Sequence, residues 1–536
     1  MTEGAFTTLD WAVLILYFAA STSIGFFFWR QSRSTEGFTA GRRSLPGWAC
    51  GLSIFATYLS SISFLALPGK SFATNWNAFV FSLSLPPTVW IAVRYFMPYY
   101  RRTNDVSAYA HLERRFGPWA RAYVSFFYIL TQLARMGVVM YLMALPLSIL
   151  TRQNILVIIV VTGISVTIYS FVGGIIAVIW ADSLQAIVLI MGAVVCSLLM
   201  LFKMPEGPQQ IFSIAAEHDK FSLGGFGASL TQPTFWVVLV YGIVINLQNF
   251  GIDQSYIQRY IASGSEKEAR KSVWLGGLLY LPVSAVFFFI GTELFAFYHA
   301  HPQHMQEART TVAEIQLLRD GVSPEAPTFD EQRREIAAQL TDAEIGDKVF
   351  AHFIGRMLPP GITGLLIAAL FAAGMSTVST SLNSSATLLA EDWYRRFLHP
   401  AAGERAMMAA LYASTALWGI LGTGVALIMT RTSENILDVW WLLAGILGGG
   451  MTGLFLLGMI SRRAGNPVAV TAVVLGLVVL SWMSLSASLP GWPAGLRSPF
   501  HGFLVPVFGT LTILLAGLLL CAICRPATSD NCPARQ

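Results

Sequence analysis

Long apolar stretches recur along almost the whole chain, and short polar segments separate them. An α-helix needs about twenty apolar residues to cross the hydrocarbon core of a bilayer, because each residue adds about 1.5 Å. Thirteen stretches meet this requirement: about 9–29, 46–67, 77–98, 119–150, 154–172, 175–202, 233–252, 271–298, 348–389, 406–430, 435–460, 466–487 and 502–524. The pattern therefore predicts an all-α polytopic membrane protein with about 13 transmembrane helices.

Basic residues between these stretches predict the orientation of the helices. They gather in alternate connections: Arg30, Arg33, Arg42 and Arg43; Arg101, Arg102, Arg114 and Arg115; Arg259, Lys267, Arg270 and Lys271; Arg395 and Arg396; Arg462 and Arg463. Cytoplasmic loops are enriched in Arg and Lys, so these connections are predicted to be cytoplasmic. We expect a bacterial inner-membrane protein with its N-terminus outside, its C-terminus in the cytoplasm, and an external polar insertion at 299–347 with a short helix near 328–341.

Composition narrows the class of function. With 55% hydrophobic and 12% charged residues, the chain is not a soluble protein of this length, and its net charge of +5 reflects orientation rather than nucleic-acid binding. No Gly-rich phosphate-binding loop of the ATPase type occurs, and no Ser/His, Asp/Asp or metal-ligand set indicates an enzyme. A transporter, a channel or a membrane sensor remains, with the bilayer and a small molecule as expected partners and no obligate protein partner.

Two predicted helices are interrupted by polar residues, five helices apart. The first reads "GWACGLSIFATYLSSISFLALPGKSF", and the second, "VYGIVINLQNFGIDQSYIQRY", is broken at Asn246, Gln248, Asn249 and Gly251. Irregular backbone inside a membrane must line a cavity, and paired interruptions are typical of transporters built from inverted repeats. We predict a 5+5 inverted repeat, divided as 1–44 (extra N-terminal helix and first loop), 45–203 (first repeat), 204–460 (second repeat) and 461–536 (two further helices and a tail).

Eight hydroxyl residues fall within "FAAGMSTVSTSLNSSATLL", residues 371–389. Ser376, Ser379 and Thr380 share one helix face, because they stand at i, i+3 and i+4, and Thr377 lies beside them. Hydroxyl oxygens are ligands for hard cations. The alternative is that these small residues only let helices pack closely.

A carboxylate also lies inside an apolar helix, at Asp182. An intramembrane carboxylate is costly and usually marks an ion pathway or pairs with a cation. Together with the hydroxyl face it favours Na⁺, while a proton relay through Asp182 and a salt bridge near the interface are the alternatives.

These segments resemble the sodium:solute symporters, a family with the leucine-transporter-type fold. The likeness rests on "RRSLPGWACGLSIFATYLSSISFLALPG", "GGIIAVIWADSLQ", "DQSYIQRYIASGSEKEA" and "STVSTSLNSSATLLAEDWY", in the family's order. The resemblance implies Na⁺ as the coupling ion and no organic cofactor. It places a first Na⁺ on the backbone oxygens of Ala56, Leu59 and Ala373 and the hydroxyls of Ser376 and Thr377. A second site would use Ser376, Ser379, Thr380 and Asp182.

Within the family, "FATYLSSISF" and "TQLARMGVVMY" resemble the bacterial sialic acid symporter branch, with Arg135 in mid-helix. Since the planar guanidinium binds carboxylates in bidentate fashion, Arg135 is predicted to hold a substrate carboxylate; an internal pair with Asp182 is the alternative. The predicted substrate site is completed by Ser60, Ser63, Gln248 and Asn249, and by Tyr58 and Ser82, which depart from the branch pattern of Thr and Gln. We expect Na⁺-coupled uptake of a small organic acid, sialic acid or a related acidic sugar. A neutral-sugar or amino-acid symporter, and a sensor or channel, are the alternatives.

Overall fold

The protein is an all-α bundle. The computed structural model describes residues 6–151, 153–319, 322–431, 448, 450–488 and 492–523. Within these ranges ten helical segments are long and apolar enough to cross a membrane, or up to eleven when a bent pair is counted as one span. The predicted fold class is confirmed, and the structure contains no strand in the ranges just given.

The long helices, in chain order, are α1 (Thr8–Phe28), α3 (Gly47–Tyr58), α4 (Ser61–Ala73), α9 (Pro118–Thr151), α10 (Ile155–Phe202), α12 (Phe235–Ile252), α14 (Glu266–Ala300), α18 (Ile362–Leu388), α19 (Glu404–Met429), α21 (Asn466–Ser488) and α22 (Leu504–Ile523). Shorter elements connect them: α2 (Thr35–Ala40), α5 (Val80–Leu83), α6 (Leu85–Ile91), η4 (Ala92–Phe96), α7 (Met97–Thr103), α8 (Ala110–Phe116), α11 (Gln209–Glu217), α13 (Gln254–Ala262), α15 (Pro302–Arg319), α16 (Phe329–Gln339), α17 (Asp342–Arg356) and η5 (Leu389–Leu398).

α10 accounts for two of the predicted spans. A straight helix of its 48 residues would be about 72 Å long, more than twice the roughly 30 Å hydrocarbon core. The helix is interrupted at Gly174, whose φ of 49° and ψ of −151° are not helical. The predicted span 435–460 is described mainly from Gly450, so the count of thirteen stays a prediction.

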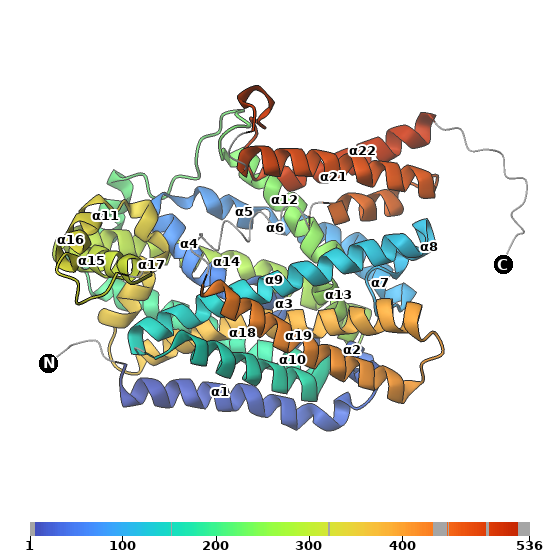
Figure 1. Cartoon of the computed structure of the whole chain (residues 1–536), viewed down its shortest axis with the longest axis horizontal. Helices are drawn as coiled ribbons and strands as arrows, with labels where there is room; N and C mark the ends of the chain where they lie inside the picture. Colours follow the sequence, from blue (N-terminus) through green and yellow to red (C-terminus); the bar gives the residue numbers. More distant parts are fainter. Residues whose placement is uncertain are drawn as a thin grey trace, which may run out of the picture.

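α18 lies in the middle of the bundle. It contacts α10, α9, α3, α1 and α19, and 89% of its apolar span is buried inside the protein. Figure 1 shows α1 along one edge of the bundle and α21 and α22 along the opposite edge. The hydroxyls of α18 therefore face other helices and not lipid.

The two ends of the bundle differ. Figure 1 shows α11, α15, α16 and α17 gathered at the end where α1 begins, whereas α22 finishes at the other end. The predicted short helix near 328–341 is confirmed as α16. The predicted span 348–389 was wrong at its start: its first residues belong to α17, and the spanning helix begins only at Ile362. Pro359 and Pro360 precede a Gly361 with φ of 85°, a sequence that cannot continue a helix.

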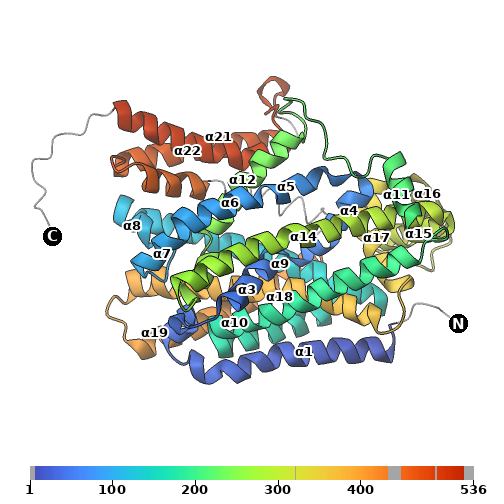
Figure 2. The same ribbon diagram turned by 180° about the vertical axis from the view of Figure 1, so that it is seen from behind.

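Two breaks divide helices next to α18. α3 and α4 form a bent pair with an angle of 60°, joined through Leu59 and Ser60 in extended conformation. Figure 2 shows this pair lying beside α14. The second break lies at Asp253, between α12 and α13, and not at the polar residues from Asn246 to Gly251, which stay helical. Asp253 ends the helix because its carboxylate accepts the Ser255 amide at 2.8 Å, as an N-cap does.

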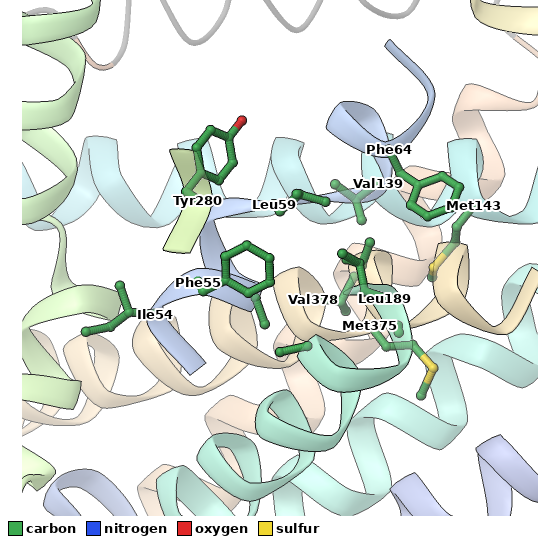
Figure 3. Packing of buried hydrophobic residues seen from close by; sticks show 14 of the residues in the cluster. Ile54, Phe55, Leu59, Phe64, Val139, Met143, Leu189, Tyr280, Met375 and Val378 are labelled. Carbon is green, nitrogen blue, oxygen red and sulfur yellow. The ribbon is translucent and has the colours of Figure 1, made fainter. Parts of the chain in front are cut away.

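Apolar side chains surround the first break. Phe55, Leu59 and Phe64 from α3 and α4 are buried, and they belong to one core cluster with residues of α9, α10 and α18 such as Val139, Leu189 and Met375. Figure 3 shows these side chains converging on the break. The buried polar side chains at the break, Ser60 and Ser61, are therefore shielded from water, and each needs a partner from the protein or from a ligand.

Candidate functional site

The residues predicted for the first Na⁺ meet where the α3–α4 break lies against α18. The Ser376 hydroxyl is 2.9 Å from the Ala56 carbonyl oxygen and 3.1 Å from that of Ala373. The Thr377 hydroxyl is also 3.1 Å from the Ala373 oxygen. Leu59 is buried at the end of α3 with ψ of 100°, so its carbonyl lies outside the regular helix. The structure thus brings together the predicted oxygens of Ala56, Ala373, Ser376 and Thr377.

This donor set suits a hard monovalent cation. It contains only uncharged oxygens, and no group of three or more His, Cys, Asp or Glu side chains able to hold a metal ion occurs in the described part of the chain. Hydroxyl and carbonyl oxygens favour alkali and alkaline-earth ions over transition metals. The two hydroxyls now donate to carbonyls, and each can rotate to offer a lone pair to an ion instead.

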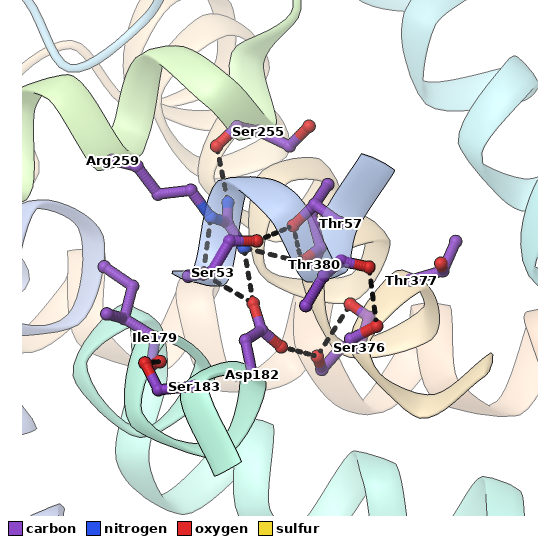
Figure 4. A network of polar contacts seen from close by, with 12 residues as sticks. Ser53, Thr57, Ile179, Asp182, Ser183, Ser255, Arg259, Ser376, Thr377 and Thr380 are labelled. Carbon is purple, nitrogen blue, oxygen red and sulfur yellow. Dashed lines mark hydrogen bonds and ion pairs between the residues drawn. The ribbon is translucent and has the colours of Figure 1, made fainter. Parts of the chain in front are cut away.

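A second buried cluster surrounds Asp182 on α10. Its Oδ2 accepts hydrogen bonds from the Ser53 hydroxyl at 2.6 Å and from Nη2 of Arg259 at 2.8 Å, and Ser379 lies 3.4 Å from its Oδ1. Arg259 also donates from Nε to Ser53 at 2.7 Å and from Nη2 to the Thr380 hydroxyl at 2.6 Å. Both charged side chains are 0% exposed. Figure 4 shows this network between α3, α10, α13 and α18.

Arg259 is the residue that the sequence analysis misplaced. It was grouped with cytoplasmic loop cations, but it lies fully buried on α13, a nine-residue helix in which every residue is buried. The salt-bridge alternative for Asp182 is therefore what the structure contains, with Arg259 as the partner. The residues predicted for a second Na⁺ do converge, yet the guanidinium already contacts two of them, Asp182 and Thr380. The signal in the sequence was Asp182 itself, because a buried carboxylate needs a cation.

Arg135 on α9 is half-buried beside the same break. Its Nη2 donates to the Thr57 carbonyl oxygen at 3.2 Å. No carboxylate lies within ion-pair distance of Arg135 among the residues that the structure describes. The alternative pairing with Asp182 is not seen, because Arg259 occupies that carboxylate.

The other predicted substrate residues fall into two groups. Ser60 caps α4 by accepting the Ser63 amide at 3.5 Å, so both stand at the break next to Tyr58. The Tyr58 hydroxyl donates to Oδ1 of Asn246, and its ring packs on Tyr280 with centroids 4.4 Å apart.

Ser82 belongs to the second group, and the hydrogen bond that its hydroxyl makes is with α14 and not with the α3–α4 break. It accepts a hydrogen bond from Ser284 on α14 at 3.0 Å. Gln248 and Asn249 are half-buried on α12, with the Gln248 amide near Gly448. The sequence analysis did not assign Asn246 to the site, although its buried amide, which donates to Ser84 at 2.9 Å, fixes the position of Tyr58.

A broken helix pair with oxygen ligands at the break, set against a central hydroxyl-rich helix, defines a secondary transporter of the leucine-transporter fold class. The chain belongs to the sodium:solute symporter family, whose sequence profile matches residues 38–476. It is therefore a Na⁺-coupled transporter and a multi-pass inner-membrane protein, not an enzyme, as the sequence predicts.

Three known proteins show how far the likeness extends. The sodium/sialic acid symporter NanT of Aliivibrio fischeri (strain ATCC 700601 / ES114) is 31% identical over 97% of this chain and 94% of its own. The sodium/sialic acid symporter SiaT of Proteus mirabilis (strain HI4320) is 30% identical over 97% and 96%. The solved structure of a Na⁺-coupled sialic acid symporter, in a substrate-bound outward-open state, matches with a TM-score of 0.83 and 28% identity over 97% of this chain and 99% of that one.

Proposed function

We propose that this protein carries a small organic acid into the cell together with Na⁺, and that the acid is sialic acid or a related acidic sugar. The substrate named for the two bacterial relatives supports this choice. The observation that carries the proposal is Arg135, a half-buried guanidinium without a carboxylate partner among the described residues.

Arg135 has the chemistry that an acid requires. A guanidinium has five N–H donors in a rigid fork, and here Nη2 uses one of them on a backbone carbonyl. A substrate carboxylate can accept two parallel hydrogen bonds from this fork and supply the missing negative charge. Tyr58, Ser60 and Ser63 follow Thr57 within six residues along the chain and would contact the rest of the substrate.

For the coupling ion we propose the oxygens of Ala56, Leu59, Ala373, Ser376 and Thr377. A Na⁺ bound there ties the end of α3 to α18 and so fixes the break on which Ser60 and Ser63 stand. With the N-terminus outside, as the charge pattern predicts, Na⁺ and then the acid bind from outside, the bundle rocks, and both are released into the cytoplasm. A second Na⁺ at Asp182, Ser376, Ser379 and Thr380 requires Arg259 to leave Thr380.

Uptake of radiolabelled sialic acid into proteoliposomes, with and without an inward Na⁺ gradient, tests this proposal. We expect accumulation only with the gradient, and Thr377→Val should abolish it, because the valine side chain has no oxygen to bind Na⁺. Thr415→Val is the matched control, since Thr415 is buried on α19 and its hydroxyl donates within that helix, to the Leu411 carbonyl oxygen at 2.8 Å. Preferred uptake of a neutral sugar or amino acid would replace the acid with that substrate, and downhill flux without Na⁺ would indicate a channel.

A further inference from the structure

Thr57 connects the proposed substrate site with the buried Arg259–Asp182 pair. It is the penultimate residue of α3 and is fully buried. Its carbonyl oxygen accepts the hydrogen bond from Arg135 at 3.2 Å. Its hydroxyl lies 3.1 Å from that of Thr380, which in turn accepts Nη2 of Arg259 at 2.6 Å. Figure 4 shows Thr57 and Thr380 between Arg259 and Ser376.

The direction of these hydrogen bonds follows from counting protons. The Thr57 hydroxyl donates its single proton to the Ser53 carbonyl oxygen at 2.8 Å. It must therefore accept from Thr380, whose oxygen accepts from Arg259. The result is one directed chain from Arg259 through Thr380 and Thr57 to Ser53, and bonds in such a chain polarise and strengthen one another.

Each ligand would act at a different residue of this chain: the acid at Thr57, and a cation at Thr380. An acid that engages Arg135 competes with the Thr57 carbonyl for the guanidinium. A cation beside Asp182 competes with Arg259 for the Thr380 hydroxyl. Among the described residues, Thr57 is the one whose polar contacts reach both Arg135 and Thr380. If one ligand moves the last turn of α3, the contacts that the other ligand needs therefore change as well.

We propose that Thr57 is a positioning residue that couples binding of the acid at Arg135 to the arrangement of the Arg259–Asp182 pair. This inference rests on the proposed function, because it takes Arg135 as the carboxylate ligand. Coupling between two sites is measured as the factor by which one ligand changes the affinity for the other, and typical factors are about 5- to 150-fold.

The test is calorimetric titration of the purified full-length protein with sialic acid, in saturating Na⁺ and in choline without Na⁺. For the wild type we expect Na⁺ to tighten binding by a factor in the typical range. Thr57→Val removes the hydroxyl but keeps the shape and the carbonyl. It should reduce that factor by about fivefold or more, while the affinity without Na⁺ stays within about twofold of the wild type.

Two further variants separate the hydroxyl from packing. Thr57→Ser restores the hydroxyl and should restore the Na⁺ factor, whereas Thr415→Val makes the same chemical change elsewhere and should leave the factor unchanged. If Thr57→Val does not fold, Thr57→Ala makes the same test with a smaller side chain.

The two proposals fail in different ways. If Na⁺ tightens acid binding to Thr57→Val by the same factor as in the wild type, the coupling role is wrong and the proposed function stands. If the wild type binds no acid while Na⁺ still raises its thermal stability, the proposed substrate falls and the coupling role falls with it.

Discussion

Two arginines inside the bundle are in opposite electrostatic situations. Arg259 has a carboxylate, two hydroxyls and no exposure, whereas Arg135 is half-buried with a backbone carbonyl as its described hydrogen-bond partner. A buried charge is stable when it is paired and hydrogen-bonded, and unfavourable otherwise. Arg259 is therefore complete within the protein, while Arg135 is suited to a partner from outside.

Substitutions at Arg135 separate its charge from its shape. Arg135→Lys keeps the positive charge but loses the planar fork, so affinity for the acid should fall by roughly ten- to a hundredfold. Arg135→Gln should fall further, and Na⁺ binding should change little, because its proposed ligands lie on α3 and α18. Calorimetry and Na⁺-dependent thermal stability measure the two effects. Unchanged acid affinity in a destabilised Arg135→Gln would make Arg135 structural and favour a neutral substrate.

Asp182 is expected to behave as one half of a pair. Asp182→Asn leaves the Arg259 guanidinium buried without its counter-charge, which typically costs about 3–5 kcal/mol of stability. The double variant Asp182→Asn, Arg259→Gln removes both charges and should be more stable than Asp182→Asn alone. Thermal unfolding of the three proteins checks this order. Equal stability of the wild type and Asp182→Asn would show that the pair contributes nothing to the fold.

The Na⁺ dependence of the same variants addresses the alternatives for Asp182. If a second Na⁺ binds there, Asp182→Asn lowers the Hill coefficient or the affinity for Na⁺. Uptake driven by a pH gradient in Na⁺-free buffer, and lost in Asp182→Asn, would instead favour the proton relay.

At the scale of elements, breaks in helices position the backbone oxygens and side chains of the candidate sites. α3 and α4 are separated at Leu59 and Ser60, α12 and α13 at Asp253, and the two parts of α10 at Gly174. Each break sets the direction of the chain on both sides of it, and the first exposes backbone oxygens to α18. A residue change at a break should therefore have larger effects than the same change within a helix.

Gly174 allows a direct comparison of this kind. A Cβ there would lie 2.8 Å from the Phe38 carbonyl oxygen, and the φ of 49° is unfavourable for a side chain. Gly174→Ala should lower stability by more than about 1 kcal/mol. Gly424→Ala is the control: Gly424 lies within α19, and apart from its chain neighbours and its own helix backbone no atom of the described residues lies within 4 Å of its Cβ position, so alanine should be neutral or stabilising. Thermal unfolding in detergent measures both, and an equally stable Gly174→Ala would show that the chain can rearrange at this turn.

The sequence predicted spans better than the places where they break. Apolar length depends on composition alone, and most predicted spans reappear within a few residues. The break of the second interrupted helix was expected at Asn246–Gly251, because polar residues look incompatible with a span. In the structure Asn246 is buried and satisfied by Tyr58 and Ser84, so the helix continues. Tertiary partners of this kind are invisible along the chain.

The invisibility of tertiary partners in the sequence also explains which parts of the candidate sites could be predicted. The hydroxyl face of α18 could be predicted because its members are three and four residues apart. Arg259 could not be placed, since its partners Ser53, Asp182 and Thr380 come from three other helices. A basic residue close to a predicted loop is assigned to that loop from sequence alone. The fold shows instead that Arg259 is buried on α13.

At the scale of the whole molecule, one helix is shared by every proposed event. α18 supplies Ala373, Ser376 and Thr377 to the first cation cluster and Ser379 and Thr380 to the second. α3 lies against it, carrying Ala56 and the break, and α9 presents Arg135 to the same turn of α3. A movement of α3 relative to α18 would therefore change the cation clusters and the acid site together, which is what coupled transport requires.

The Arg259–Asp182 pair also fixes the electrical account of a transport cycle. The pair is neutral by itself, and the first cation cluster contains no carboxylate, so one Na⁺ carried with one anionic acid moves no net charge. A second Na⁺ beside Asp182 would add one positive charge per cycle, and an inside-negative voltage would then favour uptake by about 2.3 kcal/mol for each 100 mV. Current recorded across a planar membrane during acid uptake therefore reports directly on Arg259. Uptake without a current would indicate that Arg259 stays on Thr380 throughout the cycle. A steady inward current would indicate that a second Na⁺ replaces Arg259 there.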